Sequence, residues 1–195
     1  MVHQTTENRD GHINSGMEAG MQPTLDRIDA LLVDLALSQE SERTVPSITP
    51  FLWFDNNLDE AITFYQSVFP DSEIIDASRM SPDGPVFTAT FELNGQRFMG
   101  LNGGPHFKFT EAISMFVSVE SQDELDDLWD KLCDGGEESR CGWLKDRFGL
   151  SWQIVPTILS QLLGSPDRER AGQAMNAMMQ MSKLSIADLQ AAYDA

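Results

Sequence analysis

Between Ile48 and Val155, apolar and polar positions follow the same order twice. Each copy opens with an apolar strand, continues with a helix that carries an apolar stripe, and ends with further strand-like runs. A βαβββ unit of this kind cannot bury its apolar sheet face alone, so two units must share a core. The pattern therefore predicts an α+β domain of two paired βαβββ modules, with a cleft between them in which a ligand would sit.

The first copy opens with Ile48–Phe54, a run apolar enough for a strand that is covered on both faces. Its helix, Leu58–Phe69, repeats apolar residues at i, i+3, i+4 and i+7. We expect Asp55-Asn56-Asn57 to form the turn and cap before this helix. Strand-like runs follow at Ser72–Ser78, Val86–Leu93 and Gln96–Leu101, and the hairpin signal Asn94-Gly95 joins the last two.

The second copy opens with Ser114–Val119, which alternates polar and apolar residues over most of its length. Its helix, Gln122–Cys133, begins at the capping box Ser121–Glu124 and ends before a Gly-Gly pair. The runs Gly142–Asp146 and Leu150–Val155 read as a closing hairpin. Both copies thus predict the same order of elements.

Four zones follow from the pattern along the chain. We expect residues 1–23 to be a disordered tail, because they are polar and have no apolar period. Residues 24–47 read as an N-terminal helix and linker, which either docks on the core or pairs with a second chain. The paired modules occupy 48–156, and 157–195 form a C-terminal helical extension. Its Met stripe, Met175, Met178, Met179 and Met181, is typical of packing rather than of a cofactor site.

Charge and composition exclude several functions. The net charge of −18 repels phosphate backbones, and the 13 Lys and Arg residues are scattered, so we expect no nucleic-acid partner. No apolar run is long enough to span a membrane, and the N-terminus lacks the pattern of a secretory signal. The two cysteines, Cys133 and Cys141, do not form a C-x-x-C pair, which indicates a reducing, cytoplasmic location.

Several sequence segments between Ile48 and the C-terminus resemble the PhnB-like family. They are Ile48–Phe54, the helix Ala61–Pro70, Met99–Phe109, Cys141–Asp146, Gly149–Pro156 and Met178–Met181. This family often carries the label 3-demethylubiquinone-9 3-methyltransferase and belongs to the vicinal oxygen chelate superfamily, with glyoxalases, extradiol dioxygenases and bleomycin-resistance proteins. The resemblance implies a U-shaped mixed sheet built from the two modules, to which the N-terminal and C-terminal helices are additions.

Enzymes of that superfamily usually hold a divalent metal through His and Glu side chains on four strands, where it acts as a Lewis acid. Aligning the two copies puts Ile48, Ser114, Gln153 and one residue of Met99–Leu101 at those positions. These side chains are poor ligands for a hard cation, so we expect neither a metal nor another cofactor. The methyltransferase label implies S-adenosylmethionine, yet no Gly-rich turn stands between a strand and a helix.

The loop after Leu101 and the closing hairpin hold the remaining candidate chemistry. His106 is the candidate acid or base, and Lys108 can hold an anionic group. Gln153 is the best candidate to face the cleft, and Trp143, with Lys145 and Asp146, is expected to rim it. The predicted ligand-binding residues are Gln153, Ser114, Phe116, Leu52, Asn102, Lys108 and Trp143.

Three function classes stay open. The leading one is a homodimeric protein that binds a small aromatic or oxygenated molecule without metal, as bleomycin-resistance relatives do. The second is an enzyme of the superfamily that uses His106 and Gln153, or a methyltransferase as the family label says. The third is an interaction protein whose surface is the helical tail.

Overall fold

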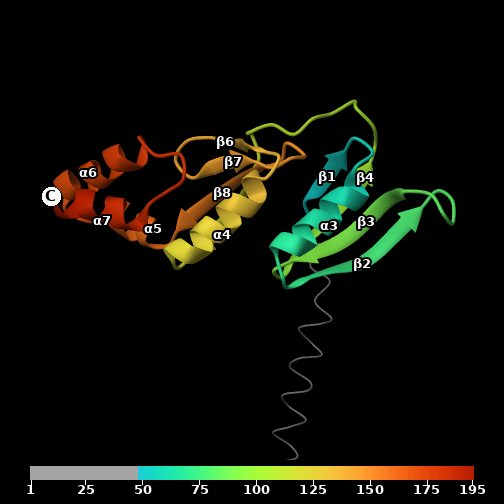
Figure 1. Cartoon of the computed structure of the whole chain (residues 1–195), viewed down its shortest axis with the longest axis horizontal. Coiled ribbons are helices and arrows are strands. Elements are labelled where there is room, and N and C mark those ends of the chain that lie inside the picture. The colour runs from blue at the N-terminus through green and yellow to red at the C-terminus, as the bar shows by residue number, and fades with distance from the viewer. Residues whose placement is uncertain (1–47) are drawn as a thin grey trace, which may run out of the picture. The chain divides into compact units, whose positions relative to one another are not determined.

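The computed structural model describes residues 48–195 (Figure 1). The predicted disordered tail and N-terminal helix lie outside these residues, and those two predictions stay untested. Residues Thr49–Ala195 form one compact unit, which contains both predicted modules and the C-terminal helices.

Each module forms its own four-stranded mixed sheet. The first contains β1 (Phe51–Phe54), β2 (Ser72–Arg79), β3 (Val86–Leu93) and β4 (Gln96–Asn102), in the order β1-β4-β3-β2. The second contains β5 (Met115–Val119), β6 (Glu137–Glu138), β7 (Trp143–Lys145) and β8 (Ser151–Pro156), in the order β5-β8-β7-β6. In both sheets the first strand of the module runs parallel to the last, and the other pairs are antiparallel.

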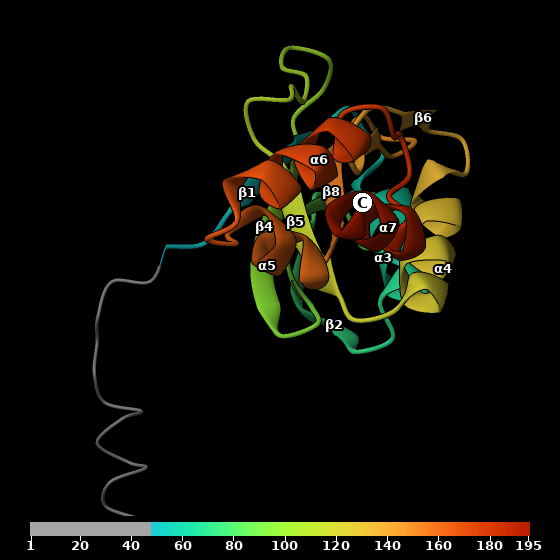
Figure 2. The ribbon, with the colours of Figure 1, turned by 90° about the vertical axis from the view of Figure 1, so that its left-hand side faces the viewer.

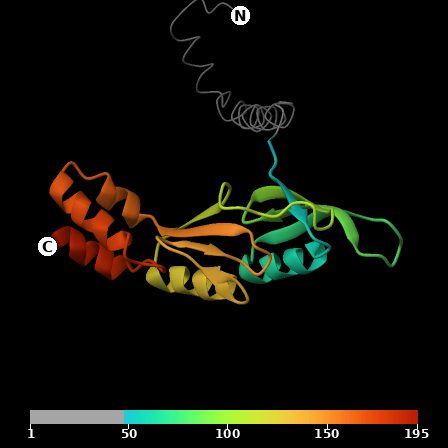
Figure 3. The same cartoon turned by 90° about the horizontal axis from the view of Figure 1, so that it is seen from above.

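This topology confirms the predicted pair of βαβββ modules. The described strands form two separate sheets rather than one continuous U, and β1 and β5 are each at a sheet edge. Helix α3 (Leu58–Val68) covers the first sheet and α4 (Gln122–Cys133) the second, both from the same side (Figure 3). The opposite face of each sheet is left open by its own module.

The two helices begin in different ways. Helix α4 has the first half of the predicted capping box, because Ser121 Oγ accepts from the backbone N–H of Glu124 at 3.2 Å. Glu124 Oε2 accepts from the N–H of Glu120, one residue before the cap, at 2.9 Å, and not from that of Ser121. Helix α3 has no such local cap. Its first N–H, on Leu58, donates instead to Oδ1 of Asn102, which lies 44 residues later in β4, at 2.9 Å. Module one therefore uses a tertiary contact where module two uses a local one.

The core is continuous through both modules and the extension. On its helix side it contains large side chains from α3 and α4, such as Tyr65 and Trp129, which are 0% and 1% exposed. Helices α5 (Ile158–Leu163), α6 (Arg168–Met178) and α7 (Ile186–Asp194) pack together at the end of the second module (Figure 2). They add Leu159, Leu162, Ala174 and Leu189 to the same core.

The methionine stripe divides between core and surface. Met178 and Met181 pack against the core, as the sequence pattern predicts, whereas Met175 and Met179 are exposed. The loop before α7 is tied to α4, because the side-chain amide of Gln122 bonds both the backbone oxygen of Leu184 and the N–H of Ile186. None of the helices between residues 48 and 195 has the length and apolar character that crossing a bilayer requires.

Candidate functional site

Four of the predicted ligand-binding residues meet on the open face of the second sheet. Gln153 on β8 is the register partner of Phe116 on β5 and of Trp143 on β7, so the three side chains form one row across the sheet. Gln153 Nε2 also donates to Ser114 Oγ at 2.8 Å. Phe116 is 60% exposed. This face therefore presents aromatic surface beside an ordered amide and hydroxyl.

The first sheet carries an equivalent row. In the first sheet Phe51 pairs with Met99, and Met99 pairs with Thr90. These three residues correspond in order to Phe116, Gln153 and Trp143 of the second sheet. Phe51 is 53% exposed and Met99 is 37% exposed. The two open faces are thus related by the repeat, and both are apolar at the strand that opens the module.

Leu52 does not lie on this face. It was expected among the ligand-binding residues, but successive side chains on a strand point to opposite sides. Phe51 and Trp53 take the open side of β1, so Leu52 points toward α3 and is 4% exposed. The structure therefore places Leu52 in the core, and Phe51 takes its place on the open face.

The register also changes which residues correspond to the superfamily's metal positions. The turn between β1 and α3 is one residue longer than the turn between β5 and α4, and Asn56 within it has a φ of 61°. Phe51 and Phe116 hold equivalent places in β1 and β5, and two residues before each of them stand Thr49 and Ser114, so Thr49 rather than Ile48 corresponds to Ser114. Met99 is the counterpart of Gln153.

These four side chains do not fit a hard divalent cation. They offer two hydroxyls, one amide and one thioether, and the amide and one hydroxyl are bonded to each other. Between residues 48 and 195, no group of three His, Cys, Asp or Glu side chains is placed to hold a metal ion. The chemistry that these side chains support is hydrogen bonding and apolar contact.

A cavity of about 380 Å³ lies where the two modules meet, and we call it the junction cavity. One wall is formed by Phe116 and Ser118 of β5 with Ser114 just before it, and residues around the β3–β4 hairpin form the other. Its remaining lining residues are Pro50, Phe69, Leu93, Asn94, Gln96, Phe98, Met115, Val117 and Trp152. No lining residue is charged, so the junction cavity suits an uncharged molecule with apolar surface.

The loop after β4 is held by contacts within the first module. Asn102 uses both ends of its amide, because Oδ1 caps α3 and Nδ2 donates to the backbone oxygen of Val86 at 2.7 Å. A side chain at Gly103 would overlap the ring of Trp53, whose Nε1 donates to the backbone oxygen of Gly104 at 2.8 Å. Asn102 thus has a structural role, which its position in a candidate ligand loop did not reveal.

His106 and Lys108 lie apart from the row that Phe116, Gln153 and Trp143 form across the second sheet. His106 is exposed at the outer part of the loop and lines none of the cavities described in residues 48–195. Lys108 lines a different cavity, with Trp53 and Phe107. The roles predicted for His106 and Lys108 stay predictions, but the two residues do not share a site with Gln153.

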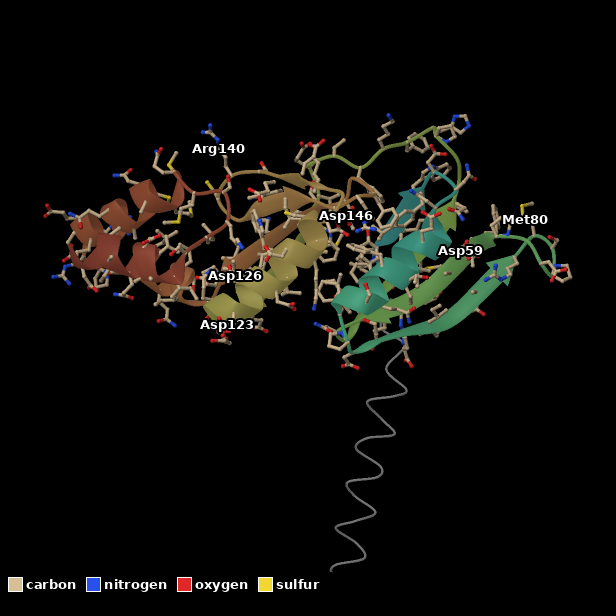
Figure 4. The ribbon with its side chains drawn as sticks, viewed as in Figure 1. Asp59, Met80, Asp123, Asp126, Arg140 and Asp146 are labelled. Atoms are coloured by element: carbon tan, nitrogen blue, oxygen red, sulfur yellow. The ribbon has the colours of Figure 1, made fainter. Side chains whose placement is uncertain are left out.

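Asp146 is buried rather than at the rim of the cleft, where its hairpin position had predicted it (Figure 4). Its carboxylate accepts four hydrogen bonds, from Tyr65 Oη at 2.8 Å, Trp152 Nε1 at 2.9 Å, and the N–H groups of Phe148 and Leu150 at 2.9 and 3.0 Å. Burial raises the pKa of Asp146, although all four donors oppose that shift. Burial first, and then the nearby carboxylate, raise the pKa of Tyr65 well above its ordinary value.

This network joins the modules, because Tyr65 belongs to α3 and Asp146 to the second module. A buried carboxylate with four donors is a frequent sign of a catalytic group. Here both partner side chains are themselves buried, at 0% and 3% exposure for Tyr65 and Trp152. Asp146 therefore acts as a structural acceptor between the modules.

Comparison with known proteins gives a family match and several similar structures. The sequence profile of the family described as 3-demethylubiquinone-9 3-methyltransferase matches residues 46–155. The PhnB protein from Bacillus cereus is 37% identical with a TM-score of 0.53, and the alignment covers 57% of this chain and 99% of that one. A protein from Staphylococcus aureus is 34% identical with a TM-score of 0.27, covering 56% of this chain and 95% of that one.

A more distant structure is FosX, a fosfomycin resistance protein from Listeria monocytogenes complexed with Mn(II) and sulfate. It is 14% identical with a TM-score of 0.45, and the alignment covers 62% of this chain and 98% of that one. No curated protein matches the chain. The family profile ends at residue 155, so the resemblance expected as far as the C-terminus is confirmed only for the paired modules.

Proposed function

We propose that this chain, which belongs to the 3-demethylubiquinone-9 3-methyltransferase family, binds a small, uncharged aromatic or oxygenated molecule without a metal ion. The observation that carries the proposal is the junction cavity, whose wall includes Ser114 and Phe116 and contains no charged residue. Its volume of about 380 Å³ lies within the range typical of small-molecule sites. Phe116 supplies apolar contact area, and Ser114, whose hydroxyl is held by Gln153 behind the cavity wall, supplies a hydrogen bond that orients the ligand.

The methyl transfer in the family's description has less support from the residues present. Phosphate-bearing and nucleoside cofactors commonly approach a Gly-rich turn between a strand and a helix. The three strand-to-helix turns of the described residues read Asp55-Asn56-Asn57, Glu120-Ser121 and Thr157, and none contains glycine. The proposed function is therefore binding rather than transfer.

A second copy of the chain completes the site in this proposal. Phe51, Met99 and Phe116 are exposed on the open sheet faces, and exposed apolar surface of this kind commonly marks an interface. We therefore expect a homodimer, with the cytoplasm as its compartment, since Cys133 and Cys141 are both free thiols. Sedimentation equilibrium of the full chain measures the first point, and a monomer at micromolar concentration would contradict it.

The test of binding is a thermal-shift and ligand-observed NMR screen of uncharged aromatic and dicarbonyl compounds against the full chain, with and without EDTA. We expect hits whose affinity is unchanged by EDTA and falls about tenfold in Phe116→Ala, because covering an exposed aromatic side chain with the ligand contributes about 1.5 kcal/mol. Met80→Ala is the matched control, since Met80 is 81% exposed in the β2–β3 turn, away from the second sheet (Figure 4).

Two results would overturn the proposal. One is binding that requires added divalent metal, and the other is a set of hits whose affinities are the same in wild type, Phe116→Ala and Met80→Ala. A titration with S-adenosylmethionine completes the experiment, because saturable binding that Phe116→Ala weakens would favour the methyltransferase instead.

A further inference from the structure

We propose that a second site, separate from the junction cavity, binds a small aromatic anion between the loop after β4 and the β7–β8 turn. A cavity of about 350 Å³ lies there, and we call it the loop cavity. Residues from both modules line it: Trp53, Phe54, Asp55, Asn57, Pro105, Phe107, Lys108, Phe109, Lys145, Arg147, Phe148 and Gly149. The loop cavity and the junction cavity have no lining residue in common.

The walls of the loop cavity are aromatic and ordered. The rings of Trp53 and Phe107 meet edge to face at 5.0 Å, and Phe54 makes edge contacts with Phe109 at 5.3 Å and Phe148 at 6.3 Å. The hydrogen bond from Trp53 to Gly104 fixes the indole plane. A flat ligand of one or two rings would gain aromatic contacts on more than one side without reorganising these residues.

The charge of the loop cavity is opposite to that of the chain. Lys108, Lys145 and Arg147 line it against the single carboxylate of Asp55, whereas the whole chain has a net charge of −18. Among the cavities of the described residues, the junction cavity has no charged lining residue, and the two others are lined by at least three acidic residues each. A local positive cavity on an acidic protein favours an anion over a neutral molecule.

The three cations differ in how free they are to meet a ligand. Lys145 is paired with Glu111 at 2.5 Å, and Arg147 is held by Asp134 with its guanidinium 4.5 Å above the ring of Phe64. Within residues 48–195, Lys108 has no ion-pair partner. Lys108 is therefore the primary contact for an anionic group. Lys145 could contact the same group only if its ion pair with Glu111 were broken.

One polar wall residue also lacks a partner. Oδ1 of Asn57, a lining residue, is inaccessible to solvent and receives no hydrogen bond from the described residues. A buried polar atom without a partner costs stability, so this side chain is free to change its rotamer without losing a hydrogen bond of Oδ1. A rotamer that turns the N–H₂ group of Asn57 into the loop cavity would allow it to donate to a carboxylate.

Together these features select a small aromatic carboxylate as the ligand class. The aromatic walls favour a ligand with a flat apolar body, and Lys108 favours a ligand that carries a negative group at its edge. The probes are 2-naphthoate and its neutral amide, 2-naphthamide, titrated into the full chain by calorimetry and by NMR of the tryptophan indole N–H signals. We expect naphthoate to bind at least fivefold more tightly than the amide and to shift the Trp53 signal.

Two substitutions act in opposite directions. Lys108→Gln should weaken naphthoate binding about three- to fivefold, the size expected for a partly exposed ion pair. Glu111→Gln should strengthen it by a similar factor, because it releases Lys145. Lys131→Gln, on α4, and Glu73→Gln, on β2, are the matched controls for a change of one charge elsewhere on the surface, and neither should change the affinity by more than about 1.5-fold.

The outcomes distinguish this site from the one proposed above. Equal affinities for naphthoate and naphthamide, or a Lys108→Gln affinity equal to that of Lys131→Gln, would overturn the loop site. Loss of naphthoate binding in Phe116→Ala would also overturn it, because that result assigns the ligand to the junction cavity. Failure of every uncharged ligand in the earlier screen leaves this titration unaffected, since the two cavities are separate.

Discussion

The hydrogen bond between Tyr65 and Asp146 predicts a measurable coupling between the two modules. Tyr65→Phe removes one hydroxyl and leaves the ring, which contacts Phe148 and Trp152, in place. The lost bond is 2.8 Å long, fully buried, and made to a carboxylate 81 residues away.

The magnitude follows from the charge and burial of the acceptor. A hydrogen bond to a charged group contributes about 1.5–3 kcal/mol, compared with about 1 kcal/mol for a neutral pair. We therefore expect Tyr65→Phe to lower the free energy of unfolding by about 2 kcal/mol. For a chain of this size that corresponds to a fall in Tm of roughly 4–8 °C.

The assay is urea unfolding followed by tryptophan fluorescence and by circular dichroism, with coincident transitions as the test of two-state behaviour. Tyr193→Phe is the matched control, because Tyr193 makes a 2.7 Å hydrogen bond to the neutral, partly exposed hydroxyl of Ser165. We expect the control to lose no more than about 1 kcal/mol. If Tyr65→Phe costs no more than Tyr193→Phe, the carboxylate does not anchor α3 and the reasoning is refuted.

Three further predictions follow from the same contacts. Because the pKa of Tyr65 is raised on folding, its contribution to stability is complete below the pKa of the unfolded chain, about 10, and is lost as pH rises through the pKa of the folded protein. The difference in unfolding free energy between wild type and Tyr65→Phe should therefore be constant from about pH 6 to 9 and shrink above about pH 10, as measured by urea titration. Gly103→Ala should cost about 1–3 kcal/mol in thermal unfolding because its methyl group meets the ring of Trp53, whereas Gly172→Ala, with open space inside α6, should be neutral or stabilising. Asn102→Ala should cost about 1–2 kcal/mol in thermal unfolding by removing the cap of α3 together with the bond to Val86. Asn102→Asp keeps an acceptor for the cap but cannot donate to the backbone oxygen of Val86, so it should recover only part of that loss, and no recovery at all would contradict the cap.

The fold was predictable because its signals are local. Helical and strand periodicity, a hairpin dipeptide and a capping box each act over fewer than ten residues, and they placed α4 and β3 at their observed bounds. The repeat of these signals then determined the topology of both sheets. The capping of α3 was missed because Asn102 is distant in sequence and its hydrogen bond depends on the packing of β4 beside β1.

The candidate site was predictable only in part. Ser114, Phe116, Trp143 and Gln153 do meet, because strand alternation in the second module follows from its sequence. Leu52 was predicted to bind the ligand because, in a strand that is apolar throughout, the sequence does not show which alternate residues face the helix. Asp146 was assigned to a rim because a charged residue in a hairpin is usually exposed, and only its four donors explain its burial.

By itself the sequence determined the two modules, their order of elements, the acidic character of the chain and the lack of metal-binding side chains at the repeated strand positions. Each of these depends on residue type and on spacing along the chain. The tertiary structure decided which cations are free, which polar groups are buried, and that Lys108 lines a different cavity from Ser114 and Phe116. Those properties depend on distances between residues remote in sequence, which packing fixes and periodicity does not encode.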